Sequence, residues 1–149
     1  MFLDPDWHLQ LIIIGQVAFA MLLGGIIGFE RELSHKPAGF RTHMLVAGAS
    51  ALFMALSISA VNYYHAVLGS PGVEADVLRV AAAIVTGVSF LGAGTIFKAN
   101  QDNNKIGGLT TAASIWFAAA VGMTTAVGQL LTATAVTIIA LIVLRVHWH

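Results

Sequence analysis

The sequence predicts an all-α integral membrane protein, a compact bundle of about five transmembrane helices with its N-terminus outside the cell and its C-terminus in the cytoplasm. The chain of 149 residues is 58% hydrophobic, against roughly 45–50% apolar residues in an average soluble domain. Only 9% of its residues are charged, and its mean hydropathy is +0.85. The length suits a single domain over residues 1–149, and we expect no soluble C-terminal domain.

Five apolar segments are long enough, or nearly so, to cross a bilayer, which takes roughly 17–25 residues. They cover residues 9–29, 43–63, 77–97, 109–127 and 130–144. The first segment follows two acidic residues and no Lys or Arg, the wrong charge for a signal peptide, so we interpret it as a retained helix. The fifth is short, and only Gly128 and Gln129 separate it from the fourth. One long broken helix, with four spans in total, is the alternative; Gly122 and Gly128 favour a tight turn between two helices.

The orientation follows from the basic residues, which gather in cytoplasmic loops of membrane proteins. They occur after the first segment, after the third and at the C-terminal end, as Arg31, Lys36, Arg41, Lys98, Lys105 and Arg145. The N-terminus and residues 62–76 have none. Arg79, near the outer end of the third segment, is the exception.

The densest charged stretch lies between the first two segments, within residues 24–46. Pro37 and Gly39 keep this turn short, so the charges on its two sides are expected to lie close together. We single out seven candidates at this cytoplasmic edge: Glu30, Arg31, Glu32, Gly39, Arg41, Thr42 and His43. Charge in a membrane segment is unfavourable unless paired. The stretch is therefore either an ion, ligand or partner site built from carboxylates facing a guanidinium, or a salt-bridge cluster that pins two helix ends.

A magnesium site is the metal hypothesis that the residues permit. Mg²⁺ prefers oxygen ligands and keeps several waters, and Glu30, Glu32 and Asp102 offer carboxylates. The six His are scattered and cysteine is absent, so no zinc spacing occurs. The sequence also lacks G-x-S-x-G, H-E-x-x-H and phosphate-binding loops. With seven basic and seven acidic residues there is no basic excess for nucleic acid. We expect no enzyme, no nucleic-acid partner and no cofactor besides a possible Mg²⁺.

Three stretches together resemble the MgtC/SapB family: GGIIGFEREL with KPAGFRTHMLV, RVAAAIVTGVSFLGAGTIFK, and GGLTTAASIWFAAAVGM. Besides the cytoplasmic-edge residues, the matching positions in the second and third stretches include Arg79, Gly87, Gly92, Gly94, Gly108, Thr110, Thr111 and Trp116. Family members often have Gln where this chain has Ala83. The missing polar group weighs against an ion path along the third segment.

The resemblance implies a multi-pass protein of the bacterial cell inner membrane with a role in magnesium homeostasis. It favours a regulatory protein that acts on other membrane machinery, with the ATP synthase as one partner, during magnesium limitation. The alternative is a small ion transporter, for which Mg²⁺ is the candidate ion. Five short helices enclose little space, so we expect a homo-oligomer in the lipid bilayer.

Overall fold

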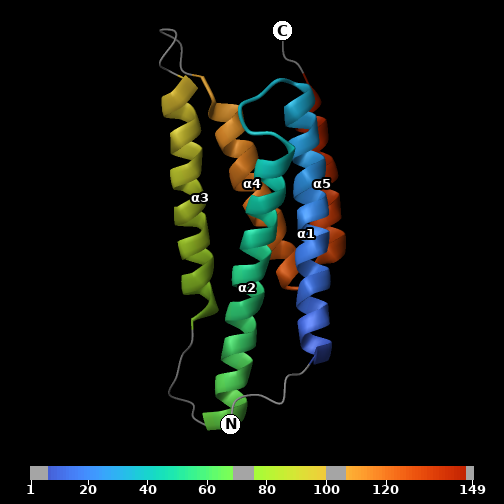
Figure 1. The fold of residues 1–149 in the computed structure, drawn as a ribbon, viewed down its shortest axis with the longest axis vertical. Coiled ribbons are helices and arrows are strands. Elements are labelled where there is room, and N and C mark those ends of the chain that lie inside the picture. Colours follow the sequence, from blue (N-terminus) through green and yellow to red (C-terminus); the bar gives the residue numbers. More distant parts are fainter. Residues whose placement is uncertain (1–6, 69–75, 100–106, 147–149) are drawn as a thin grey trace.

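The computed structural model describes residues 7–68, 76–99 and 107–146, and these form an all-α bundle (Figure 1). The helices are α1 (Trp7–Leu33), α2 (Phe40–Leu68), α3 (Val77–Ala99), α4 (Leu109–Ala126) and α5 (Leu130–Arg145). By length and composition the first four are apolar and long enough to cross a membrane, whereas α5 is a shorter apolar helix. The predicted fold class is confirmed; the orientation in the membrane stays a prediction.

Helices α1, α2, α3 and α5 extend beyond the apolar segments that predicted them, whereas α4 ends one residue short, at Ala126. Helix α1 continues through Glu30, Arg31 and Glu32, and α2 begins at Phe40, before Arg41. Glu30, Arg31, Glu32 and Arg41 therefore lie in helical turns, and of the charged residues in this stretch Lys36 lies in the connecting loop. This matters for the site, because a helical residue has a fixed face and direction.

Helices α4 and α5 are separate and antiparallel, as the tight-turn prediction required (Figure 1). Gly128 adopts the left-handed conformation, with φ 81°, which glycine reaches without the strain that a Cβ would cause. Its N–H donates to the carbonyl of Thr125 at 3.0 Å, closing α4. The alternative of one long broken helix is wrong.

Helix α4 is the central helix of the bundle, because it contacts α1, α2, α3 and α5. Its contact with α2 is close: a Cβ added to Gly122 would lie 2.1 Å from the carbonyl oxygen of Ala47. Between α1 and α2, a Cβ on Gly24 would lie 2.6 Å from the carbonyl oxygen of His43. Glycines thus bring three helix backbones together, as small residues do in membrane bundles.

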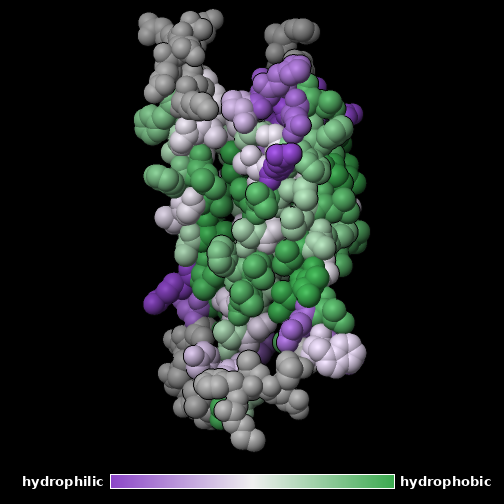
Figure 2. Space-filling model, in the orientation of Figure 1, coloured by the Kyte–Doolittle hydropathy of each residue, from purple (hydrophilic) through white to green (hydrophobic). Residues whose placement is uncertain are grey.

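The α1–α2 turn and the end of α5 lie at the same end of the bundle, which we call the hairpin end (Figure 1). Helix α3 begins at the opposite end. Figure 2 shows apolar residues over the middle of the visible face and hydrophilic residues near both ends. This distribution suits a protein whose middle faces lipid and whose ends meet water.

Candidate functional site

The turn between α1 and α2 sets the geometry of the hairpin end. Helix α1 ends with the N–H of Lys36 donating to the carbonyl of Arg31 at 3.0 Å, and His35 takes a left-handed conformation with φ 52°. This is how many helices end. Glu32 then reaches across the turn, and its Oε2 accepts the N–H of Phe40 at 2.9 Å. Glu32 therefore satisfies a free N–H in the first turn of α2.

Glu30 and Arg31 form a buried ion pair in the last turn of α1. Their exposed fractions are 7% and 3%, and Arg31 Nε lies 2.5 Å from Glu30 Oε2. Ser34 Oγ donates to the other carboxylate oxygen at 3.0 Å. Arg31 Nη2 also donates to the carbonyl of Leu144 at 3.2 Å. The pair thus ties α1 to the last turn of α5 and satisfies a carbonyl that a helix end leaves free.

His43 lies fully buried in the first turn of α2, with an exposed fraction of 0%. Its Nδ1 is 2.9 Å from the carbonyl oxygen of Gly39, so Nδ1 carries a proton, because a carbonyl only accepts. Its Nε2 is 2.9 Å from Ser114 Oγ on α4. Ser114 Oγ is also 2.8 Å from the carbonyl oxygen of Thr111.

The hydroxyl of Ser114 has one proton and two neighbouring acceptors, so two proton arrangements fit this geometry. With neutral His43, Ser114 donates to Nε2. With protonated His43, Nε2 donates to Ser114, which then donates to the carbonyl of Thr111. His43 is therefore hydrogen-bonded to Gly39 and to Ser114 in both charge states, whereas Ser114 donates to the carbonyl of Thr111 only when His43 is protonated.

Gly28 makes room for this arrangement. A Cβ at this position would lie 2.7 Å from the carbonyl oxygen of Gly39 and 2.9 Å from Cβ of His43. Any larger residue would push the first turn of α2 away from α1, and with it the imidazole.

The structure divides the predicted cytoplasmic-edge residues into two groups. Glu30, Arg31 and His43 are buried, and Gly39 is half-buried. The exposed members are Glu32, Arg41 and Thr42. One carboxylate does face a guanidinium here, but the partner of Glu30 is its neighbour Arg31 and not Arg41 across the turn.

Most residues of the other two motifs lie apart from this cluster, but the carbonyl of Thr111 belongs to it through Ser114. Arg79 is in the first turn of α3, and Gly87 and Gly94 face open space. A Cβ on Gly92 would meet Ala112 at 3.4 Å. Gly108 precedes α4 in a left-handed conformation with φ 82°. Thr111 is buried, whereas Thr110 and Trp116 are exposed.

Three contacts in the bundle involve residues that no motif singled out. Ser114 and Leu144 complete the cluster as described. Near the opposite end, Gln16 Nε2 donates at 3.2 Å to the carbonyl of Ala126 in the last turn of α4. Small side chains recur at four-residue spacing on α4, as Ser114, Ala118 and Gly122, and this is the sequence signal that could have found one of them.

Magnesium at Glu30 and Glu32 stays a prediction. In the described parts of the chain, no group of three or more His, Asp or Glu residues has a geometry that would hold a metal ion. Both oxygens of Glu30 accept hydrogen bonds from protein groups, and one oxygen of Glu32 binds a backbone N–H. Asp102, the third candidate, lies outside the described residues.

The fold and the cluster together define a multi-pass helical membrane protein whose buried charges are paired at one end of the bundle. The chain belongs to the MgtC family, whose sequence profile matches residues 17–148. The comparison thus confirms the family resemblance that the three stretches indicated.

Three curated relatives illustrate the match. Protein SapB of Bacillus subtilis is 38% identical over 127 residues, which is 83% of this chain and 51% of the relative. Protein MgtC of Brucella abortus is 43% identical over 122 residues, 82% of this chain and 45% of the relative. A protein of Escherichia coli K12 named "Putative magnesium transporter YhiD" is 48% identical over 109 residues, 72% of this chain and 47% of the relative.

The chain spans about half the length of the curated relatives it matches. No solved structure matches the chain at a significant level.

Proposed function

We propose that this protein is a non-enzymatic regulator in the bacterial inner membrane, which binds other membrane proteins during adaptation to low magnesium. The relatives support the magnesium connection, since one carries a magnesium transporter in its name. The family resemblance makes the ATP synthase the first partner to test. We also expect the protein to form a homo-oligomer in the bilayer.

The observation that carries this proposal is the internal pairing of the buried charges. Both oxygens of Glu30 and the Nε and Nη2 of Arg31 bond to groups of the bundle itself. A partner protein would therefore bind the exposed groups at the hairpin end, which include Lys36 and Arg41. Arg41 makes no ion pair within the described residues, so its guanidinium is available for an acidic surface.

Close helix packing supports the regulator over the transporter. The glycine contacts of α1, α2 and α4 fill the bundle interior with backbone and small side chains. The three grooves described on its surface are lined almost wholly by apolar groups. An ion needs polar or charged groups along its path, and within the described residues the buried ionisable groups of one copy, Glu30, Arg31 and His43, all lie at the hairpin end.

The transporter remains the second candidate because of the named relative. In that case the path would run between copies of an oligomer rather than through one bundle.

The deciding experiment uses two preparations of the full chain. In inverted membrane vesicles that contain ATP synthase, ATP-driven proton pumping is recorded with and without this protein. We expect pumping to fall when the protein is present, and Arg41→Ala to restore it while Arg41→Lys does not. In liposomes that hold this protein alone, we expect no Mg²⁺ uptake above that of empty liposomes.

Mg²⁺ uptake by the protein alone would contradict the regulator proposal and support the transporter proposal. Unchanged proton pumping would exclude the ATP synthase as the partner. Asn62→Ala is the control, because it removes an exposed polar side chain from the part of α2 toward the opposite end and should leave the effect on pumping intact.

A further inference from the structure

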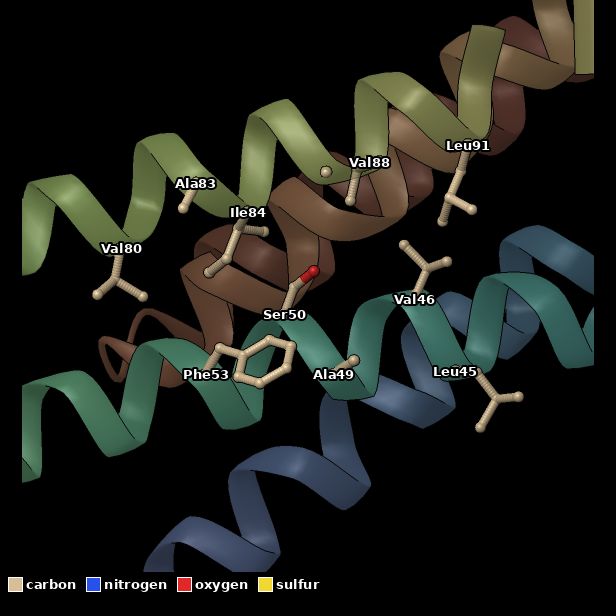
Figure 3. Close-up of a pocket in the computed structure, with 11 residues that line it drawn as sticks. Leu45, Val46, Ala49, Ser50, Phe53, Val80, Ala83, Ile84, Val88 and Leu91 are labelled. Atoms are coloured by element: carbon tan, nitrogen blue, oxygen red, sulfur yellow. The ribbon is translucent and has the colours of Figure 1, made fainter. Parts of the chain in front are cut away.

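A groove opens between α2 and α3 on the face that the fold presents to lipid. It has a volume of about 510 Å³, inside the range of roughly 300–1,000 Å³ that is typical of small-molecule sites. Its walls are aliphatic and aromatic side chains such as Phe53, Ile84 and Leu91 (Figure 3). Gly87 deepens it, because nothing lies within 4 Å of the place where a Cβ would be.

The length and position of the groove match one leaflet of a bilayer. On α3 it runs from Val80 to Leu91, which is about 16 Å at the helical rise per residue. The hydrocarbon core of a bilayer is about 30 Å thick. The groove therefore begins near the first turn of α3 and ends close to the middle of the membrane, which is the reach of a single acyl chain.

The guanidinium of Arg79 is carried by the turn of α3 next to the end of this groove that is nearer the membrane edge. Ala83, Gly87 and Leu91 line it at four-residue spacing, and Arg79 continues the same helical row one turn toward the start of α3. The side chain of Arg79 is exposed and makes no hydrogen bond or ion pair within the described residues. A guanidinium at this depth suits a phosphate, which it binds with two parallel hydrogen bonds.

We propose that this groove binds an anionic phospholipid, with one acyl chain along the groove and the phosphate held by Arg79. The apolar lining excludes a polar ligand inside the groove, and the guanidinium of Arg79 at its edge selects for negative charge. Asp76 is the nearest described carboxylate in the sequence. Its Oδ1 accepts the N–H of Leu78 at 2.9 Å and of Arg79 at 3.3 Å, so it caps the helix and moderates the attraction.

The side chain of Ser50 distinguishes a bound acyl chain from a docked partner helix. Its side chain is 98% buried, since its exposed fraction is 2%, and its hydroxyl points into the groove (Figure 3). An acyl chain leaves this hydroxyl free to turn back to its own helix, as serines in helices do. A polar residue of a partner helix would instead use it.

The test measures lipid retention by the purified full chain. The protein is incubated with equal amounts of phosphatidylglycerol and phosphatidylcholine, and retained lipids are counted by native mass spectrometry. We expect preferential retention of one phosphatidylglycerol. Arg79→Gln should lower that preference about fivefold, the effect of one basic residue at a membrane surface. Arg79→Lys should keep most of it, and Asp76→Asn should raise it.

Filling the groove tests the acyl-chain part of the site. Gly87→Leu should abolish retention of both lipids, and Ala83→Leu serves as a second variant with the same expectation. Gly94→Leu is the matched control, because Gly94 lies on the same helix, also faces open space and is outside the groove. Thermal unfolding in detergent checks that all three variants are folded.

Three results would overturn the proposal. The first is equal retention of the two lipids by the unchanged protein, and the second is full retention by folded Gly87→Leu and Ala83→Leu. The third is a protein bound in the groove, released by Ser50→Ala and unaffected by Arg79→Gln, which would make the groove a helix-docking site.

Discussion

The imidazole Nε2 of His43 on α2 lies 2.9 Å from the hydroxyl oxygen of Ser114 on α4, which joins two helices through residues 71 positions apart. Both side chains are buried. The contact fixes the rotation of α2 against the central helix at the hairpin end. It also places the only imidazole buried within the described residues beside a hydroxyl that donates or accepts.

Ser114→Ala should lower the free energy of unfolding by about 1–3 kcal/mol, because it leaves the Nε2 of His43 buried without a partner. Unfolding in mixed detergent micelles measures the change. Ser89→Ala is the control, since Ser89 is exposed and its hydroxyl bonds only to Val85 of its own helix. Equal stability of the two variants would mean that the contact contributes nothing to the fold.

Arg31→Gln should destabilise the protein by about 3–5 kcal/mol, because the carboxylate of Glu30 then stays buried without its counter-charge. Removing both charges, as in Glu30→Gln with Arg31→Gln, should recover part of that loss. The same unfolding measurement compares the three proteins. Glu32→Gln changes an exposed capping residue and should lower stability by at most about 1 kcal/mol. Additive losses in the double variant would contradict a coupled pair.

Gly122→Ala should lower stability by about 1–3 kcal/mol, the range for inserting atoms into a packed interior. The added Cβ would lie 2.1 Å from the carbonyl oxygen of Ala47, so α2 and α4 must move apart. Gly15→Ala is the matched control, since nothing lies within 4 Å of its Cβ position and alanine favours a helix. A loss in Gly15→Ala equal to that in Gly122→Ala would show that close packing is not the cause.

The orientation is open to a direct test because the chain has no cysteine of its own. A single cysteine introduced as Lys36→Cys should react with a membrane-impermeant thiol reagent in inverted vesicles and not in intact cells. Tyr64→Cys, exposed in the part of α2 toward the opposite end, should show the reverse. If both sites are labelled from the other side, the prediction from Lys and Arg is wrong.

The sequence predicted the helices well because runs of apolar residues leave few alternatives in a membrane. The division of α4 from α5 was also predictable, since Gly128 supplies the conformation that a tight turn requires. Helix ends were less accurate: α1 runs to Leu33 and so includes the charges that the hydropathy pattern placed at its edge.

The pairings inside the site were not predictable in the same way. Glu30 had Arg31 and Arg41 as candidate partners, and the choice depends on the direction in which the last turn of α1 faces. The partner of His43 depends on the register of α2 against α4, which close glycine contacts such as that of Gly122 with Ala47 determine. Such distances between chain segments have no local sequence signal.

The central place of α4 has a consequence for the order in which the protein is assembled. A chain inserted from its N-terminus delivers α1 and α2 first, and these two already share the close contact at Gly24. Helix α3 enters next, before one of its two neighbouring helices has been made. Only the arrival of α4 brings together α1, α2 and α3, and α5 then closes over Arg31 through the carbonyl of Leu144. The hydrogen bond from Arg31 to α5 is therefore formed last, with a stretch of chain synthesised more than a hundred residues after Arg31.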